Sequence, residues 1–239
     1  MNLIKISLYI LMIDIFIKLS LLFLLIMFIK NILDMNKYNK NSTLISIDDI
    51  SDLEENKIIL DPVLISYQFN KDILIKELID NNPIKYFKDN QNLIRFNDFN
   101  INKDIFINKN KELFDELNSQ ELCDKIYKKF KLFYSFNNNY FASIFQGNNI
   151  TKINKNKHNI CVIGCLNGKC NIYLYNPKHV DYLENQNNKK WAIQVNLLSN
   201  NLLYIPSNWF YNIETEEECI LFHIDADNYF TSIYNEYRN

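Results

Sequence analysis

The feature that most restricts this chain is an apolar run near its start. From Ile6 to Ile29 the sequence reads ISLYILMIDIFIKLSLLFLLIMFI. As a helix rising 1.5 Å per residue this run is roughly 36 Å long, enough to cross the hydrocarbon core of a bilayer. Asp14 and Lys18 interrupt it, but they are four residues apart and therefore share a helix face on which they can pair. We expect residues 1–30 to form an uncleaved transmembrane anchor.

Two other interpretations of the same run predict different products. A secretory signal peptide has a shorter apolar core, of about 7 to 15 residues, followed by a small-x-small cleavage site. The residues after this run, Lys30-Asn31-Ile32-Leu33-Asp34, offer no such site. The other alternative is a helix buried in a soluble core. The length of the run favours the membrane anchor over both.

The lysines on the two sides of the run predict its orientation. Lys5 precedes it, whereas Lys30, Lys37 and Lys40 follow it, and positive charge collects on the cytosolic side of membrane helices. An odd number of cysteines, five, without framework spacing fits a reducing compartment. We therefore expect a single-pass membrane protein whose globular part faces the cytosol.

The composition of the remainder limits the class of protein. A polar stretch rich in Asn and Lys, residues 31–43, is typical of a linker, and residues 44–239 suffice for one domain. A net charge of -2 and a pI near 6.0 argue against a nucleic-acid partner. With 14% aromatic residues, a collagenous, disulfide-scaffold or disordered chain is excluded. The excess of Asn and Lys is what AT-rich codons produce, so we draw no function from it.

The apolar pattern of the domain changes along its length. Lys57 to Phe69 predicts two short strands split at Asp61-Pro62, and Lys71 to Asp80 a short helix. Lys111 to Phe130 has near-helical apolar spacing and predicts one amphipathic helix with a core-facing stripe. Beyond Tyr140, short apolar runs recur every 8 to 12 residues or so, as in a β-sandwich or barrel. The expected strands are Tyr140 to Phe145, Asn159 to Cys165, Cys170 to Tyr175, Trp191 to Leu197, Leu202 to Ile205, Trp209 to Glu214 and Cys219 to Asp225.

The dipeptide Asn167-Gly168 separates two of these runs. It is a strong signal for a type I′ hairpin turn, because both residues tolerate positive φ. Cys165 and Cys170 would then be cross-strand neighbours. The pattern as a whole predicts a mainly β fold with flanking helices.

Two segments resemble the JmjC and cupin-like oxygenases. Thr151 to Pro177 (TKINKNKHNICVIGCLNGKCNIYLYNP) is similar to the stretch in which a metal-binding H-x-D strand leads through an apolar strand and a glycine turn, here Gly168, to a Leu-aromatic-Pro-Pro ending. Leu202 to Glu214 (LLYIPSNWFYNIE) is similar to the later Leu-aromatic-Ile-Pro and Trp-Trp-His segment. The residues that match that segment are Ile205, Pro206, Trp209 and Phe210. The resemblance implies a double-stranded β-helix with helices outside it, of a kind found among large DNA viruses.

In that family two His and one carboxylate hold iron, which leaves sites for 2-oxoglutarate and oxygen. This chain departs from the pattern at every ligand position. The H-x-D falls on Asn154 and Asn156, or in a second alignment on Lys155 and Lys157, and the distal His falls on Tyr211. A lysine that grips 2-oxoglutarate in some relatives falls on Cys170, with Lys169 one residue out of register. The resemblance thus implies the fold without its metal chemistry.

Other chemistry-bearing residues permit weaker hypotheses. His158, Cys161, Cys165 and Cys170 lie close in sequence, but their spacing matches no zinc knuckle and suits buried strands better. His223-Ile224-Asp225 is a true H-x-D whose side chains share one strand face. With His158 or His179 it could form a rearranged iron site, although a hydrogen-bonded core histidine is the plainer interpretation. No local signature supports a Cys-His nucleophile.

These observations predict a membrane-anchored, cupin-like protein that lacks the family's iron ligands and has a non-catalytic binding or structural role. We expect no catalytic residue, metal or cofactor, and the sequence names no protein or small-molecule partner. One alternative is an Fe(II)/2-oxoglutarate oxygenase with rearranged ligands. The other is a metal-free small-molecule pocket, which convergent polar groups in the barrel mouth would favour.

Overall fold

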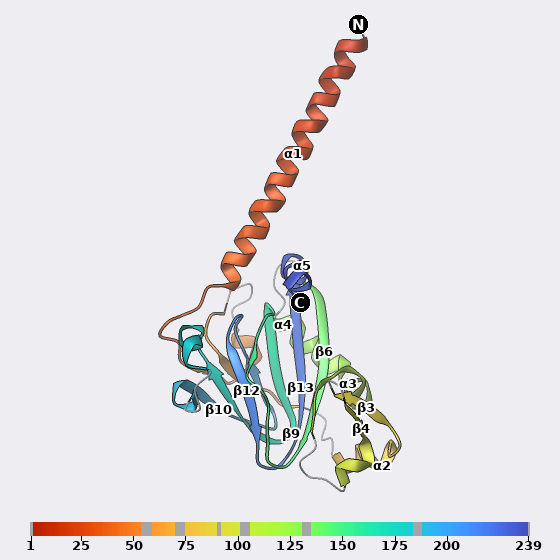
Figure 1. The fold of residues 1–239 in the computed structure, drawn as a ribbon, viewed down its shortest axis with the longest axis vertical. Coiled ribbons are helices and arrows are strands. Elements are labelled where there is room, and N and C mark those ends of the chain that lie inside the picture. The colour runs from red at the N-terminus through yellow and green to blue at the C-terminus, as the bar shows by residue number, and fades with distance from the viewer. Residues whose placement is uncertain are drawn as a thin grey trace. The chain divides into compact units, whose positions relative to one another are not determined.

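A computed structural model of the chain describes residues 2–53, 59–69, 75–89, 92–100, 106–130, 135–183 and 188–238. The chain divides into two compact units, Met1–Lys37 and Tyr38–Asn239 (Figure 1). The start of the first strand predicted from Lys57 and the start of the helix predicted from Lys71 lie outside the described residues.

The first unit is one long helix, α1 (Asn2–Met35). Its segment Leu11–Met35, 25 residues, is long and apolar enough to cross a membrane. Within it, the Lys18 ammonium lies 2.6 Å from the Asp14 carboxylate, which is the pairing that their spacing predicts. The helix continues through residues 31–35, the first part of the stretch expected to be a linker. A helix that is apolar on all sides suits a lipid environment, so α1 could span a membrane.

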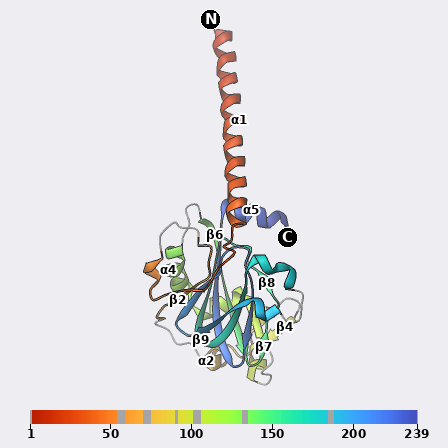
Figure 2. The same cartoon turned by 90° about the vertical axis from the view of Figure 1, so that its left-hand side faces the viewer.

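The second unit is mainly β with flanking helices, as predicted. One sheet has the order β1-β2-β11-β9-β13-β6-β5 and is antiparallel except for the parallel β1–β2 pair. Its strands are β1 (Ile45–Ile47), β2 (Val63–Ser66), β5 (Phe106–Asn110), β6 (Ser135–Gln146), β9 (Ile160–Tyr175), β11 (Asn201–Tyr204) and β13 (Glu218–Asn228). In Figure 2, β2 and α4 lie on one side of this unit, and β7 and β8 lie on the other.

A second set of strands faces the first and shares β9 with it. Here β9 pairs with β10 and β12, and β12 also pairs with the two short strands β7 and β8. The bounds are β7 (Asn149–Ile150), β8 (Asn154–Lys155), β10 (Ala192–Leu198) and β12 (Phe210–Thr215). The first half of β9 pairs with β13 and β11, and the second half, from Lys169 on, pairs with β10 and β12. One bent strand therefore joins two sheets into a barrel-like pair, as in a double-stranded β-helix.

The hairpin predicted at Asn167-Gly168 is wrong. β9 runs without a turn from Ile160 to Tyr175, and Gly168, at φ +77°, lies beside a register shift where the strand passes between sheets. A positive φ suits a strand irregularity as well as a turn, and local sequence does not distinguish them. Cys165 and Cys170 are consequently on one strand, and the cross-strand partner of Cys170 is Leu197.

Two hydrophobic cores result from alternation along the strands. The inner core lies between the sheets and contains, among others, Cys161, Ile163, Ile172, Trp209 and Leu221. The outer core lies on the other face of the larger sheet and includes Val162, Phe222 and Ile224. Successive residues on β9 and β13 thus contribute to opposite cores, which the period of two in a strand requires.

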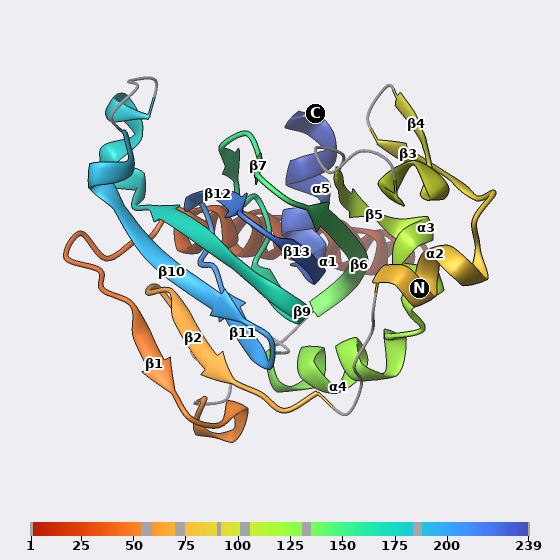
Figure 3. The ribbon, with the colours of Figure 1, turned by 90° about the horizontal axis from the view of Figure 1, so that it is seen from below.

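Helices and a small hairpin cover the outer core. They are α2 (Ile75–Asn81), α3 (Lys111–Leu117), α4 (Gln120–Phe130), the 3-10 turns η1 (Ile50–Asp52) and η2 (Phe96–Asn100), and the hairpin of β3 (Tyr86–Asp89) with β4 (Asn92–Arg95). Figure 3 shows this hairpin and the two 3-10 turns η3 (Pro177–Tyr182) and η4 (Asn188–Trp191), coloured teal, on opposite sides of the domain. The last element is α5 (Tyr229–Arg238).

The single helix predicted from Lys111 to Phe130 is two helices. Asn118 adopts a left-handed conformation, φ +47°, and ends α3, after which α4 begins at Gln120. Asn tolerates this conformation better than most residues, so it ends a helix as Gly commonly does. The apolar stripe nevertheless packs in the core, since Leu113, Leu117 and Ile126 are buried.

Candidate functional site

The candidate site begins on the inward face of β13. Cys219, Leu221, His223, Asp225 and Asp227 alternate along this strand, and all of them are buried. His223 is 0% exposed and Asp225 2%, and both side chains point toward the space between the sheets, as their H-x-D spacing predicts. A buried carboxylate requires a compensating partner, so the groups around Asp225 define the site.

Lys109 supplies that partner through a bulge in β5. Ile107 pairs with Ile144 and Asn110 with Ala142, so Asn108 and Lys109 together oppose the single residue Ser143. Lys109 has φ +48°, an uncommon value for a non-glycine residue. Bulges of this kind redirect side chains, and here the Lys109 ammonium lies 2.7 Å from Asp225 Oδ2.

The charges in this pair stabilise each other. Burial by itself lowers the pKa of Lys109, but the anionic surroundings, with the Asp225 carboxylate in direct contact, outweigh burial, and the pKa is raised. Burial raises the pKa of Asp225, but Lys109 and His158 outweigh it and hold that pKa below its usual value. Tyr211, which is buried, has its ring centre 5.9 Å from the ammonium. Burial raises the pKa of Tyr211, so its phenol stays protonated.

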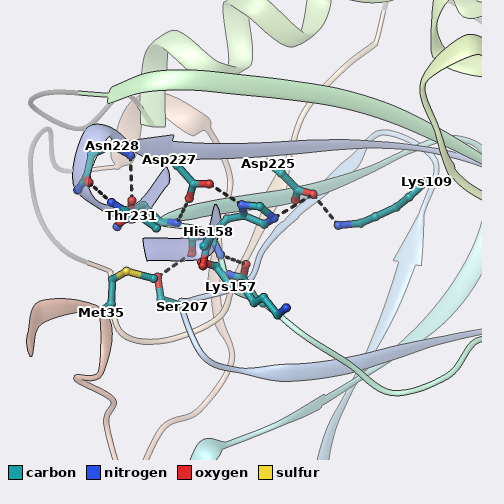
Figure 4. A network of polar contacts seen from close by, with 12 residues as sticks. Met35, Lys109, Lys157, His158, Ser207, Asp225, Asp227, Asn228 and Thr231 are labelled. Carbon is teal, nitrogen blue, oxygen red and sulfur yellow. Dashed lines mark hydrogen bonds and ion pairs between the residues drawn. The ribbon is translucent and has the colours of Figure 1, made fainter. Parts of the chain in front are cut away.

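His158 connects a second carboxylate to the pair (Figure 4). Its Nδ1 lies 2.8 Å from Asp227 Oδ2, and its Nε2 lies 3.7 Å from Asp225 Oδ2. Burial lowers the pKa of His158, but the hydrogen bond to Asp227 and the charge of Asp225 together raise it by more than burial lowers it. The net shift of the pKa is therefore upward. The side chains of Lys109 and His158 are each 29% exposed, whereas Asp225 is 3% exposed. The network therefore joins a buried carboxylate to two side chains that are partly exposed.

The two asparagines that the first alignment places at the H-x-D positions, Asn154 and Asn156, have different surroundings. Asn154, on β8, is exposed, and its amide donates to the carbonyl of Lys152. Asn156 is buried, and its Nδ2 donates to the carbonyls of Ile205, 2.9 Å away, and Pro206, 3.0 Å away. Its Oδ1 accepts from the backbone N–H of His158. Asn156 thus fastens the Ile205-Pro206 turn to the segment that presents His158.

His223 is held on the opposite side of Asp225 from this turn. Its Nε2 lies 2.8 Å from Ser143 Oγ, while its Nδ1 has no hydrogen-bond partner among the residues that the structure describes. Ser143 Oγ also accepts from the backbone N–H of Lys109 and donates to Asn108 Oδ1. Burial and the Lys109 charge lower the pKa of His223 to about 3, so its imidazole is neutral near pH 7.

The other residues singled out by the family motif build the fold around this site. Trp209 is wholly buried in the inner core, whereas Phe210 is half-buried outside it, with the Lys155 ammonium 5.6 Å from its ring centre. Pro177 opens η3 directly after the Asn176 cap. The side chains of Trp209 and Phe210 thus lie on opposite faces of the sheet, as the period of two residues in a strand predicts.

The donor set does not fit the iron that the family resemblance implies. The position of the distal His is taken by Tyr211, which faces an ammonium, and Asp225 already binds that ammonium. His179 lies in η3 against Trp191. Within the described ranges no group of three His, Cys, Asp or Glu side chains is arranged to hold a metal ion.

The five cysteines are buried free thiols. Cys161 lies beside Asp225, and burial followed by that carboxylate raises the pKa of its thiol. Cys165 Sγ is 3.9 Å from Cys219 Sγ. The hypothetical zinc group of His158 with these thiols is not assembled. A cavity of about 220 Å³ lies elsewhere, lined by Lys169, Cys170, Asn171, Asn196, Glu214 and Glu216, and shares no residue with the network.

Comparisons with known proteins concern the fold alone. No protein-family model matches the chain, and no curated protein does. Among solved structures it is similar to a cupin superfamily protein from Desulfitobacterium hafniense, at 11% identity and a TM-score of 0.30, over 41% of this chain and 73% of that one. It is also similar to a conserved protein of unknown function from Streptococcus pyogenes, at 5% identity and a TM-score of 0.30, over 38% of this chain and 66% of that one. The strand pairing of this chain itself, two sheets joined through β9, gives the arrangement of a double-stranded β-helix.

Sequence reasoning missed the most connected members of the network. Lys109, Ser143 and Asp227 carry no motif, and each depends on a strand partner distant in sequence. Only Asp227, which continues the alternation of His223 and Asp225, was detectable, because i+2 positions share a face. The bulge that directs Lys109 inward leaves no local signal.

Proposed function

We propose that this protein is a membrane-anchored, JmjC-like member of the cupin class whose iron site has degenerated and whose role is binding or structural. Its composition is compatible with the large DNA viruses in which such proteins occur. The active-oxygenase alternative requires His223 and Asp225 to act as ligands. In the structure both residues already contact other groups, His223 the Ser143 hydroxyl and Asp225 the Lys109 ammonium. These contacts favour the proposal over the alternative.

The observation that carries the proposal is the Lys109–Asp225 ion pair at 2.7 Å. A metal in the barrel would neutralise buried carboxylates, and here an ammonium from the chain itself does so. A lysine side chain does not have to be taken up from solution as a metal ion does, and it offers no coordination position to a substrate. Asp225 therefore serves as counter-ion to Lys109, and His223 as a partner of Ser143.

The polar network supports binding better than catalysis. Its two partly exposed side chains, Lys109 and His158, lie beside two buried carboxylates, and a metal-free binding site needs such a convergence of polar groups. They are bonded mainly to one another, which suits a rigid surface for a partner. Neither a ligand nor a partner is identified by these groups.

The membrane part of the proposal depends on α1 and on charge. Leu11–Met35 has the length and composition of a span, and the Lys excess after the apolar run favours a cytosolic domain.

Iron analysis tests the catalytic question. The full-length protein in detergent is incubated anaerobically with ferrous iron, desalted, and analysed for iron and for 2-oxoglutarate decarboxylation. We expect less than about a tenth of an equivalent of iron and no turnover, in the wild type and in His223→Ala alike. Stoichiometric iron that is lost in His223→Ala would overturn the proposal and establish the oxygenase alternative.

A further inference from the structure

An exposed aromatic patch occurs on η3 and η4, away from the network. We define it as His179, Tyr182 and Trp191, with Val180 beside them. The Tyr182 and Trp191 rings are stacked with centroids 5.3 Å apart, and the His179 ring lies 4.9 Å from Trp191. Tyr182 is 47% exposed, Val180 45% and Trp191 39%. Rings that pack on one another yet remain exposed form a preformed apolar surface.

Lysines border this patch. The Lys190 ammonium lies 5.0 Å from the Trp191 ring centre, and Lys178 precedes His179. Lys189 is engaged with Glu214 at 2.6 Å, and Asp181 is the acidic residue within η3. Trp and Tyr at the headgroup level, together with Lys, are the residues that anchor proteins at membrane interfaces.

The chain that enters the domain is fastened next to the patch. Asn176 Nδ2 donates to the carbonyl of Asn39 at 2.7 Å, and Lys178 Nζ donates to the carbonyl of Lys40. The last residue of α1 is Met35, so the three residues Asn36 to Tyr38 lie between the helix and the attachment at Asn39. The four Cα–Cα steps from Met35 to Asn39 span at most about 14 Å. The tether between the end of α1 and this attachment is therefore short.

We propose that the aromatic patch inserts into the headgroup region of the bilayer that holds α1, giving the domain a second membrane contact. This inference rests on the proposed anchoring of the chain. A short tether makes the second contact effectively intramolecular, so a patch too small to bind a membrane by itself suffices. The lysine border favours anionic lipid.

Tryptophan quenching by lipid tests the proposal directly. The chain has two Trp residues, of which Trp209 is fully buried and Trp191 belongs to the patch. The full-length protein is placed in nanodiscs of phosphatidylcholine and phosphatidylserine, with or without bromine on the acyl chains near the headgroups. We expect bromination to lower Trp191 emission by about half, and Trp191→Phe to remove the quenched component. Substituting Lys178 and Lys190 with Gln should weaken the quenching.

A matched control places a Trp away from the patch. Tyr86, on β3, is 54% exposed, so Tyr86→Trp in the Trp191→Phe background should stay unquenched. If the protein is found in discs but Trp191 is not quenched, the membrane contact of the aromatic patch is wrong, whereas anchoring by α1 still holds. Protein that does not co-purify with discs would overturn both. Two copies per disc, with Trp191 shielded from lipid and from a soluble quencher alike, would identify a second copy as the occupant and contradict the proposal.

Discussion

His223 shows how one buried side chain can govern the response of the domain to acid. Its pKa is about 3 in the folded protein, because of burial and the Lys109 charge, against an ordinary value of 6.5. A group whose pKa is lowered by folding contributes stability above its unfolded pKa and loses it as the pH falls toward the folded one. The contribution of His223 is therefore complete above about pH 6.5 and declines toward pH 3.

We predict that His223 lowers the unfolding free energy of the wild type by about 2 to 3 kcal/mol when the pH falls from 6.5 to 4.5. Unfolding then takes up one proton, and each pH unit changes the free energy by about 1.36 kcal/mol. His223→Gln should lack that loss. The raised pKa of His158 acts in the opposite direction, since its contribution is present at low pH and is lost as the pH rises. Guanidinium unfolding of the full-length protein in detergent, at a series of pH values, measures both. Equal pH slopes in wild type and His223→Gln would refute the assignment.

Trp209 should be the largest single contributor to the inner core. It is 0% exposed, whereas its neighbour Phe210 is half-buried. We predict that Trp209→Ala lowers the unfolding free energy by about 3 to 5 kcal/mol and that Phe210→Ala costs clearly less. Thermal unfolding of the two variants compares them, and equal costs would show that the aromatic pair does not divide between faces.

At the scale of elements, the contact between β9 and β13 depends on a glycine. A Cβ at Gly164 would lie 2.1 Å from Phe222 Cζ and 2.9 Å from Leu202 Cδ2, so a side chain cannot fit there without displacement. We predict that Gly164→Ala costs about 1 to 3 kcal/mol. Adding Phe222→Leu removes the ring atoms in conflict, so the double variant should be more stable than the sum of the two single costs predicts. Additive costs would mean that the backbone relaxes instead.

Elements were predictable where periodicity alone specifies them. The strands after Tyr140, the core-facing stripe of α3 and α4, and the shared face of His223 and Asp225 follow from residue spacing. The errors at Asn118 and at Asn167-Gly168 have one cause. Positive φ at Asn or Gly occurs in turns, helix ends and strand bulges, and partners distant in sequence decide among these. For the same reason the bulge at Lys109, and with it the centre of the candidate site, was not predictable.

At the scale of the whole molecule, the account requires α1 to remain attached and in lipid. We predict that the protein stays in the membrane fraction after alkaline carbonate extraction and that deletion of residues 2–35 releases it. Asn41, in the sequon Asn41-Ser42-Thr43, should carry no glycan in cells, because in the proposed orientation this segment does not meet the glycosylation machinery. Soluble full-length protein, or a glycan on Asn41, would contradict the anchoring or the orientation respectively.

A thermodynamic cycle measures whether the Lys109 ammonium is the cation that balances Asp225 inside the barrel. Lys109→Met leaves the Asp225 carboxylate, which is 3% exposed, without its ion-pair partner. Asp225→Asn leaves the Lys109 ammonium without its ion-pair partner. We predict a cost of about 2 to 4 kcal/mol for each, at or below the typical cost of breaking a buried pair, because Lys109 keeps 29% exposure.

The decisive result is the double variant, Lys109→Met with Asp225→Asn, compared with the exposed control Lys169→Met. Lys169 lies 3.4 Å from Glu217 with both side chains about half exposed, so its loss should cost less than about 1 kcal/mol. In guanidinium unfolding of the full-length protein, the account predicts that the double variant recovers at least about 2 kcal/mol relative to the sum of its single variants. If the costs of the two single variants add in the double variant, the two side chains do not form the ion pair that stabilises the barrel. Single costs as small as that of Lys169→Met would contradict the prediction as well.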